Sequence, residues 1–157
     1  MELKDSGTRR EFPSGAVRDI NEGKGRCDLL PLDVVGEVFG DDVLNNLDGY
    51  VRTGDKELLV EALKEFSKKR YGDLYTAILE VSKHYEDGCN KYGERNWEKG
   101  IPIHCYIDSG VRHYIKWLRG DKDEPHDRAF LWNMLGALWT QDYHPEYCDL
   151  PFGKEEV

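Results

Sequence analysis

The feature that most constrains this chain is a helical spacing of apolar residues that recurs from Pro31 to Thr140. Successive stretches place apolar side chains three and four positions apart, which puts them on one face of an α-helix. No stretch of useful length alternates apolar and polar residues as a half-buried strand does. The sequence therefore predicts an all-α fold, a helical bundle in which facing helices line a cleft.

Capping residues divide this pattern into separate helices. Gly40 fits the left-handed end of one helix, and Asp41 or Asp42 fits the cap of the next. The expected helices span residues 31–40, 41–47, 56–70, 72–90, 104–118 and 125–140. The expected buried stripe of the fourth helix is Leu74, Ala77, Ile78, Val81 and Tyr85.

The first 30 residues depart from the helical pattern, because Pro13, Gly15, Gly23 and Gly25 interrupt any regular period. We expect an extended, irregular N-terminal arm over residues 1–30 and a helical domain over residues 31–157. A chain of 157 residues fits one domain. Such a domain buries roughly 70% of the surface that its unfolded chain exposes.

The charge and cysteine content exclude several classes of protein. Thirty-one acidic residues against 22 Lys and Arg give a net charge of −9, which disfavours direct binding of nucleic acid. A polyphosphate ligand would then need metal ions or a local basic pocket. The four cysteines form no CxxC pair, which favours reduced thiols. No apolar run could span a bilayer, and the first residues lack a signal-peptide core, so we expect a cytoplasmic protein with no membrane partner.

Four acidic residues are candidates for binding a divalent cation. Glu80 lies on the fourth expected helix, with Glu86, Asp87 or His84 as its possible partner, and Glu124 and Asp127 have an ExxD spacing at the start of the last helix. Carboxylates from facing helices supply the oxygen ligands that Mg²⁺ or Mn²⁺ requires and leave positions for water and phosphate. We predict that Glu80 and Asp127 are catalytic. In the alternative, Glu124 only caps the helix before Pro125, and Asp127 only stabilises the helix dipole.

A second set of residues is suited to a nucleotide. Asn96 and Trp97 lie beside Lys91 in KYGERNWEKGIP. Aromatic planes, amides and cations together can stack on a base and bind its edge or a phosphate, although Trp is more often a core residue. Lys24 and Arg26 would share one side of an extended segment, where ordinary surface charge is the simpler interpretation.

The motifs GAVRD, GKGRCDLLPLD, KYGERNWEKGIP, RHYIKWLRGD and DEPHDRAFLWNMLGALWT occur in this order. Together they resemble the N-terminal-type domain of phage dATP/dGTP diphosphohydrolases, the MazZ-like group, which is similar to MazG-like all-α nucleoside triphosphate pyrophosphatases. The resemblance covers most of residues 14–152. It implies an all-α fold, a Mg²⁺ or Mn²⁺ cofactor, a dimer or tetramer, and a purine deoxynucleoside triphosphate cleaved to monophosphate and pyrophosphate.

The resemblance also assigns roles to individual residues. The family motif is an acidic cluster on one helix followed by ExxD on the next. Its second half maps onto Glu124 and Asp127, whereas Glu80 and Glu86 stand where an EExxE cluster would be. The residues assigned to phosphate and base recognition are Lys24, Arg26, Lys91, Asn96, Trp97, Arg112, His113 and Asn133.

Two other functions stay open at this point. The adjacent pair His126 and Asp127, with His104 or His113 upstream, resembles an HD-domain phosphohydrolase, which would release triphosphate or phosphate. A phage accessory protein that binds a nucleotide without turnover would retain the same pocket. The phosphate product, or its absence, distinguishes these functions.

Overall fold

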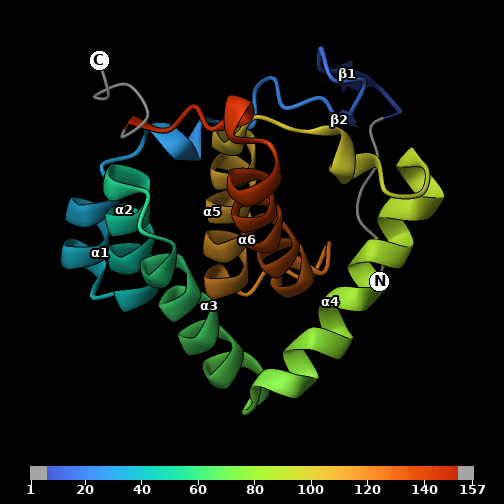
Figure 1. Cartoon of the computed structure of the whole chain (residues 1–157). Helices are drawn as coiled ribbons and strands as arrows, with labels where there is room; N and C mark the ends of the chain where they lie inside the picture. Colours follow the sequence, from blue (N-terminus) through green and yellow to red (C-terminus); the bar gives the residue numbers. More distant parts are fainter. Residues whose placement is uncertain (1–6, 152–157) are drawn as a thin grey trace.

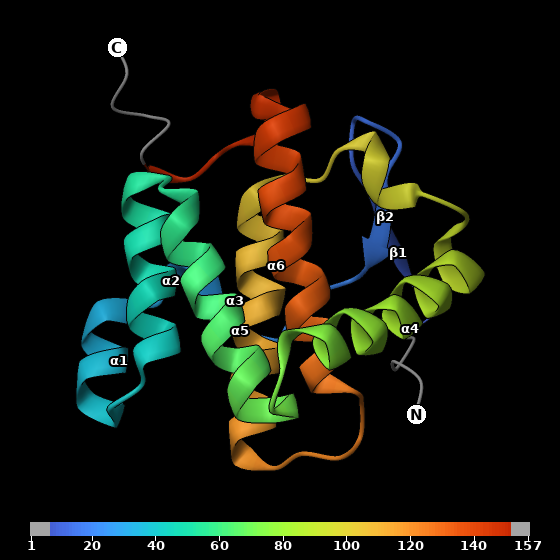
Figure 2. The same ribbon diagram turned by 60° about the horizontal axis from the view of Figure 1, so that its bottom comes forward.

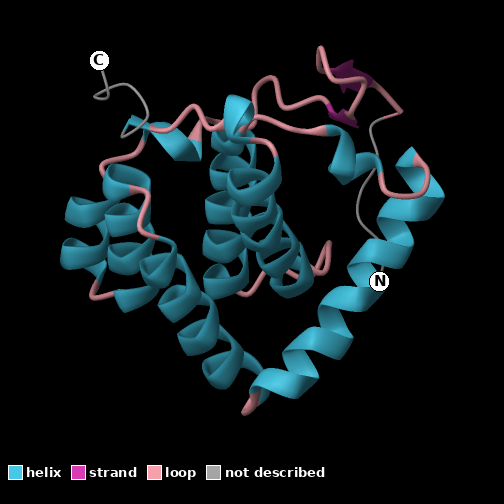
Figure 3. Cartoon of the chain, viewed as in Figure 1, coloured by secondary structure: helices cyan, strands magenta, loops and turns pink. Residues whose placement is uncertain are grey.

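The computed structural model describes residues 7–151, most of which lie in six α-helices (Figures 1 and 3). The all-α prediction is confirmed. The helices are α1 (Leu32–Phe39), α2 (Asp42–Thr53), α3 (Lys56–Tyr71), α4 (Leu74–Tyr92), α5 (Ile103–Arg119) and α6 (His126–Tyr143). Among the described residues no helix combines the length and apolar character needed to cross a bilayer.

Helices α5 and α6 form an antiparallel pair at the centre of the molecule (Figures 1 and 2). Their contact buries Tyr106 from α5 and Met134 from α6 completely. Two glycines make this close approach possible. A Cβ at Gly110 would lie 2.2 Å from the Met134 Cε, and one at Gly136 would lie 2.4 Å from the Tyr106 Cε1.

Helices α1, α2 and α3 pack on one side of the central pair (Figure 1). Of the two predicted caps, Asp41 and Asp42, it is Asp41 that caps α2, by accepting a hydrogen bond from the Leu44 N–H at 2.8 Å. The prediction that this helix ends at residue 47 was wrong. It continues to Thr53 because Leu47 and Tyr50 are both fully buried, and it stops at Gly54, whose φ is +73°.

Helix α4 diverges from α3 and crosses the other side of the central pair (Figures 1 and 2). Its buried residues are Ala77, Val81 and His84, which follow a single line along the helix. The prediction that Ile78 is buried was wrong, since its side chain is 61% exposed. Helix α4 contacts the bundle along a narrow line, so apolar residues beside that line remain at the surface.

The N-terminal arm contains a short antiparallel hairpin of β1 (Arg9–Glu11) and β2 (Val17–Asp19), which the prediction of an irregular arm did not include. Residues 1–6 of the arm lie outside the described residues. The hairpin docks on the 3₁₀ segment Asn96–Lys99. The Asn96 side chain accepts from the Val17 N–H at 2.9 Å and donates to the Val17 carbonyl at 2.8 Å. Tertiary contacts thus hold the arm against the helices.

Candidate active site

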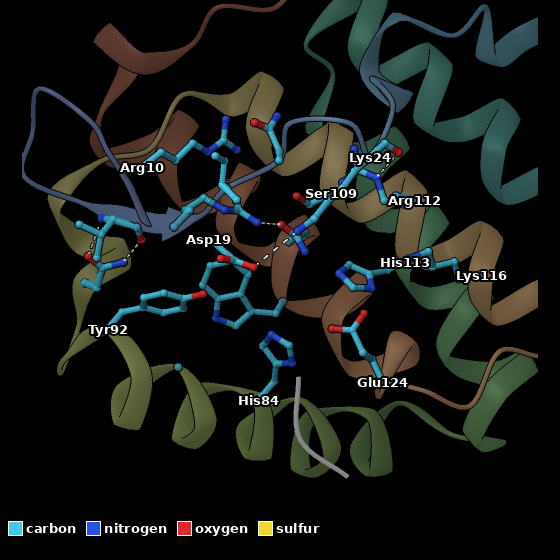
Figure 4. Close-up of a pocket in the computed structure, with 18 of the residues that line it drawn as sticks. Arg10, Asp19, Lys24, His84, Tyr92, Ser109, Arg112, His113, Lys116 and Glu124 are labelled. Atoms are coloured by element: carbon cyan, nitrogen blue, oxygen red, sulfur yellow. Dashed lines mark hydrogen bonds and ion pairs between the residues drawn. The ribbon is translucent and has the colours of Figure 1, made fainter. Parts of the chain in front are cut away.

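A cavity of about 460 Å³ lies between the β-hairpin, α4 and the α5–α6 pair (Figure 4). Its lining carries more positive than negative side chains, although the whole chain is acidic. A local basic pocket is one of the two arrangements that would let such a chain bind polyphosphate. The charged residues of the lining are Arg10, Arg18, Asp19, Lys24, Arg112, Lys116, Asp123 and Glu124.

The hairpin brings a buried guanidinium into the cavity. Arg18 lies over the rings of Tyr106 and Trp132, 5.4 Å and 5.5 Å from their centroids. Its Nη2 donates to the Asn133 Oδ1 at 3.0 Å, whereas its Nη1 has no hydrogen-bond partner among the described residues. Burial lowers the pKa of Arg18. A buried donor without an acceptor is costly, so this nitrogen is suited to an anionic ligand.

A buried ion pair positions the loop that carries Lys24. Arg112, on α5, donates to the Asp108 Oδ1 at 2.6 Å and to the Gly25 carbonyl at 2.7 Å. The same Asp108 oxygen accepts from the Cys27 N–H at 2.6 Å. Asp108 is only 1% exposed. These bonds fasten the loop across α5 and place Lys24 at the cavity.

A histidine near the C-terminal end of α5, His113, contacts the first residue of α6, His126. The Nδ1 atoms of His113 and His126 are 2.9 Å apart, and the His126 Nε2 lies 2.8 Å from the Asp123 Oδ1. His113, Glu124 and His126 each offer one ligand atom, and these three atoms lie within 4.8 Å of one another. Burial holds the pKa of His113 well below its usual value, and the charges of His126 and His84 lower it further. His113 is therefore a neutral imidazole at physiological pH.

A third histidine extends from α4 into the cavity (Figure 4). His84 is 4% exposed, and its ring lies 5.6 Å from that of Trp132. Burial, followed by the charge of Arg18, lowers the pKa of His84 to about 3. Its Nδ1 has no hydrogen-bond partner among the described residues. His84 is thus a neutral, buried polar group with one nitrogen available for a ligand.

Two of the acids predicted to bind metal do not line the cavity but lie beside cationic side chains. Glu80 accepts from the Lys83 Nζ at 2.8 Å and from the Arg128 Nε at 3.1 Å. The hydrogen bond from Lys83 is the largest cause of the lowered pKa of Glu80. Asp127 accepts from the Arg70 Nε at 3.2 Å.

Asp127 also accepts from the Tyr71 hydroxyl at 2.8 Å. Of the other two predicted metal ligands, Glu86 is exposed on α4 outside the cavity. Glu124 lines the cavity beside His113 (Figure 4). Of the four acids, the structure brings Glu124 alone into the cavity lining.

The structure places only some of the residues predicted to bind the substrate at the cavity. Arg26 pairs with Asp28 through bonds of 2.8 Å and 2.7 Å at the surface. Trp97 packs between the rings of Tyr85 and Trp139, and Lys91 lies in the last turn of α4. The remaining predicted residues all line the cavity: Lys24, Asn96, Arg112, His113 and Asn133.

Sequence reasoning did not assign several residues of this cavity. Arg10 and Arg18 reach it only because the hairpin folds over α4 and α5, which no local pattern indicates. His126 is not part of the cavity lining but contacts His113 from the first residue of α6. The sequence had suggested it only as half of an HD-type pair. The other unassigned polar residues of the lining are Asp19, Asn21, Ser109, Lys116 and Asp123. The sequence had suggested His84 only as a possible partner of Glu80.

A family model described as dATP/dGTP diphosphohydrolase, N-terminal, matches residues 60–149. The chain belongs to this family. The match spans α4, α5 and α6, and hence the histidine end of the cavity, whereas the hairpin precedes it. No curated protein and no solved structure matches the chain. The resemblance seen in the motifs is confirmed over the matched residues, and membership of the dATP/dGTP diphosphohydrolase family indicates a hydrolase.

Proposed function

We propose that this protein hydrolyses dGTP or dATP to the monophosphate and pyrophosphate in the cavity between the hairpin and helices α4 to α6. The observation that supports this proposal is that the cavity has two chemically different ends, in a chain of the dATP/dGTP diphosphohydrolase family. Cations from the hairpin side and from α5 are suited to phosphate, whereas histidines and an acid lie at the turn between α5 and α6. A volume of about 460 Å³ is within the usual range for a small-molecule site.

The chain's own residues supply the binding groups. The Arg18 Nη1 and the Lys24 and Lys116 ammonium groups can bind phosphate oxygens, and these bonds are strong where water is excluded. Trp132 and Tyr92 offer ring surfaces on which a purine can stack. Arg112 positions the loop that carries Lys24, because it donates hydrogen bonds to Asp108 and to the backbone carbonyls of Lys24 and Gly25.

The family resemblance implies Mg²⁺ or Mn²⁺, and the histidine end of the cavity fits a divalent cation. The ligand atoms of His113, Glu124 and His126 lie close enough together to hold one. Such a cation would offset phosphate charge and lower the pKa of a bound water. The neutral His84 can hydrogen-bond a water or a phosphate oxygen through its Nδ1.

We also propose that the protein is a homo-oligomer, as the resemblance implies. Tyr75, Ile78 and Leu79 are 79%, 61% and 68% exposed on one part of α4. Neighbouring exposed apolar side chains of this size are typical of a surface that another protein chain covers. Light scattering coupled to size-exclusion chromatography would report a monomer if this part of the proposal were wrong.

Product identification tests the proposed reaction. The purified chain is incubated with each of the four deoxynucleoside triphosphates and Mn²⁺ or Mg²⁺ in ¹⁸O-labelled water, and the products are separated by anion exchange and weighed by mass spectrometry. We expect dGMP or dAMP carrying the label, with unlabelled pyrophosphate, because water attacks the α-phosphorus. A Glu124→Gln variant purified in parallel controls for contaminating phosphatases.

Other products would identify the competing functions. Release of triphosphate would favour the HD-type reaction, although Asp127 accepts hydrogen bonds from Arg70 and Tyr71 and does not line the cavity with His113. Tight nucleotide binding without any product would favour a non-catalytic nucleotide-binding protein. Either result would contradict the proposed diphosphohydrolase activity.

A further inference from the structure

We propose that the base of the substrate lies over Gly88 of α4, and that the missing side chain at this position leaves the room that a purine needs. The inference rests on the proposed function, because it says where the base of that substrate binds. Gly88 is then a specificity-determining residue. It sets the space available to the base and takes no part in the reaction itself.

Gly88 differs from every other glycine that the structure describes. It lies inside α4, where glycine is destabilising relative to alanine because it loses more conformational freedom on folding. The other described glycines either have a positive φ or would bring a Cβ closer than 3.0 Å to a neighbouring atom. At Gly88 the φ is helical, and beyond the adjoining helix backbone a Cβ would meet no protein atom within 4 Å. Neither backbone conformation nor packing therefore requires a glycine here.

The space beside Gly88 opens into the cavity. His84, Gly88 and Tyr92 follow one another at intervals of four residues, so they share one face of α4, and all three line the cavity. At a rise of about 1.5 Å per residue, the two side chains are attached about 12 Å apart along the helix, with bare backbone between them. A smaller cavity of about 20 Å³ adjoins the first at this place. The residues that line both are Gly88, Tyr92, Asn96 and Trp132.

The groups around this gap are suited to a flat base. The ring centroid of Trp132, from α6, lies 5.6 Å from that of His84 and 6.1 Å from that of Tyr85, and bases of any type stack on aromatic rings. A glycine allows a ligand to approach the backbone closely. Arg10 also lines the cavity, and its Nε has no hydrogen-bond partner among the described residues. The N7 atom, an acceptor in both adenine and guanine, would satisfy this donor.

The cations determine the direction in which the nucleotide lies. In Figure 4, Tyr92 lies at the end of the cavity away from Lys24 and Lys116, and His84 lies between them. With the triphosphate at Lys24 and Lys116, as proposed, the base extends along α4 toward Tyr92. A purine reaches farther from the sugar than a pyrimidine does, because it has a second fused ring. We therefore expect a purine to cover Gly88 and a pyrimidine to stop short of it.

The test measures the binding of dGMP, dCMP and pyrophosphate to the full chain by isothermal titration calorimetry. None of these ligands is a nucleoside triphosphate, so no turnover disturbs the measurement. We expect Gly88→Ala to weaken dGMP binding about 10-fold and Gly88→Leu at least about 50-fold, because the added carbon atoms occupy the space of the ring. The affinities for dCMP and pyrophosphate should change less than about 3-fold, because neither ligand fills that space.

Two further measurements distinguish a binding role from a structural one. Alanine favours the helix, so Gly88→Ala should unfold at a higher urea concentration than wild type while it binds dGMP less tightly. A glycine that the fold required would give a less stable alanine variant. Asn90→Leu is the matched control, because Asn90 is exposed on the same helix and does not line the cavity. It should leave dGMP binding unchanged.

Three results would overturn the proposal: no binding of dGMP to the wild-type chain, unchanged dGMP affinity in Gly88→Leu, or equal losses of affinity for dGMP, dCMP and pyrophosphate. The product assay tests the reaction separately. Hydrolysis by a chain whose Gly88 variants bind dGMP normally would refute this base site alone. The expected binding pattern without hydrolysis would refute the proposed function alone.

Discussion

Two glutamates, one in the cavity and one on the outer surface of α4 and α6, have different neighbours. In the cavity, Glu124 lies with the neutral imidazole of His113. On the outer surface, Glu80 accepts hydrogen bonds from Lys83 and Arg128. An acid held by protein cations contributes to the fold, whereas an acid in the lining of a cavity is placed where a ligand can reach it.

The histidines of α5 show the same contrast. Burial lowers the pKa of His113 and keeps its ring neutral. At the other end of α5, the hydrogen bond to Asp149 raises the pKa of His104 to about 10. The comparison teaches that the tertiary neighbours of a side chain, more than its type or helical position, decide whether it binds a ligand or stabilises the fold.

The largest effect expected from this contrast concerns activity. Glu124→Gln should lower kcat/KM for dGTP at least about 100-fold, because it removes the carboxylate of the candidate cation site. The fold-loss in kcat/KM for Glu80→Gln should be less than about a tenth of that for Glu124→Gln, because the Glu80 carboxylate binds Lys83 and Arg128. Initial rates of dGMP formation measure both. Equal losses in the two variants would remove the distinction between cavity and surface acids.

The next effect concerns stability and compares a buried with an exposed ion pair. Asp108→Ala should lower the free energy of unfolding by about 3–5 kcal/mol, because it leaves Arg112 buried without its carboxylate. Asp142→Ala should cost less than about 1 kcal/mol, because the Lys56–Asp142 pair is about half exposed. Urea unfolding followed by circular dichroism gives both values. A small effect at Asp108 would show that the loop before α1 does not depend on this pair.

A smaller effect compares two cations of the same loop. Lys24 lines the cavity, whereas Arg26 pairs with Asp28 at the surface. Lys24→Ala should raise KM for dGTP about 5- to 10-fold with little change in kcat, since a phosphate contact made equally in ground and transition states affects binding alone. Arg26→Ala should change KM several-fold less. Steady-state kinetics at matched metal concentration would contradict this if Arg26→Ala had the larger effect.

The smallest expected effect is the pH dependence of the surface pair His104 and Asp149. The folded pKa of His104 is raised to about 10 from 6.5, so its stabilising contribution is complete below pH 6.5 and is lost as the pH rises through 10. Since both side chains are more than one-third exposed, the contribution should not exceed about 1 kcal/mol. Unfolding of wild type and His104→Gln at pH 6 and pH 10 should show a difference that shrinks with pH. A constant difference would exclude the pair as its cause.

Local sequence signals predicted most of the helices. Apolar periodicity placed α3 and α5 to within about two residues, because it depends on neighbouring residues alone. The end of α2 was misjudged, since Tyr50 is buried by tertiary contacts that extend the helix beyond its clearest apolar period. The hairpin was not foreseen, because its strands are three residues each and depend on Asn96 for docking.

The sequence predicted only some of the residues that line the cavity. Lys24, Arg112 and Glu124 could be proposed from their chemistry and their motifs, and the structure places all three in the cavity lining. Arg18 could not, because its importance depends on burial without a hydrogen-bond partner, which has no local sequence signal. Helical periodicity placed Glu80 on a polar flank but could not show that Arg128, 48 residues further along, would bind it.

The sequence by itself determined that this chain is helical, where most helices begin and end, and, through its motifs, which family it belongs to. The tertiary structure decided which of its many acids and histidines share a cavity and which are neutralised by arginines and lysines. The physical reason is range. Capping and apolar periodicity act over a few neighbouring residues, whereas the electrostatic surroundings of a side chain depend on residues that only folding brings within a few ångströms.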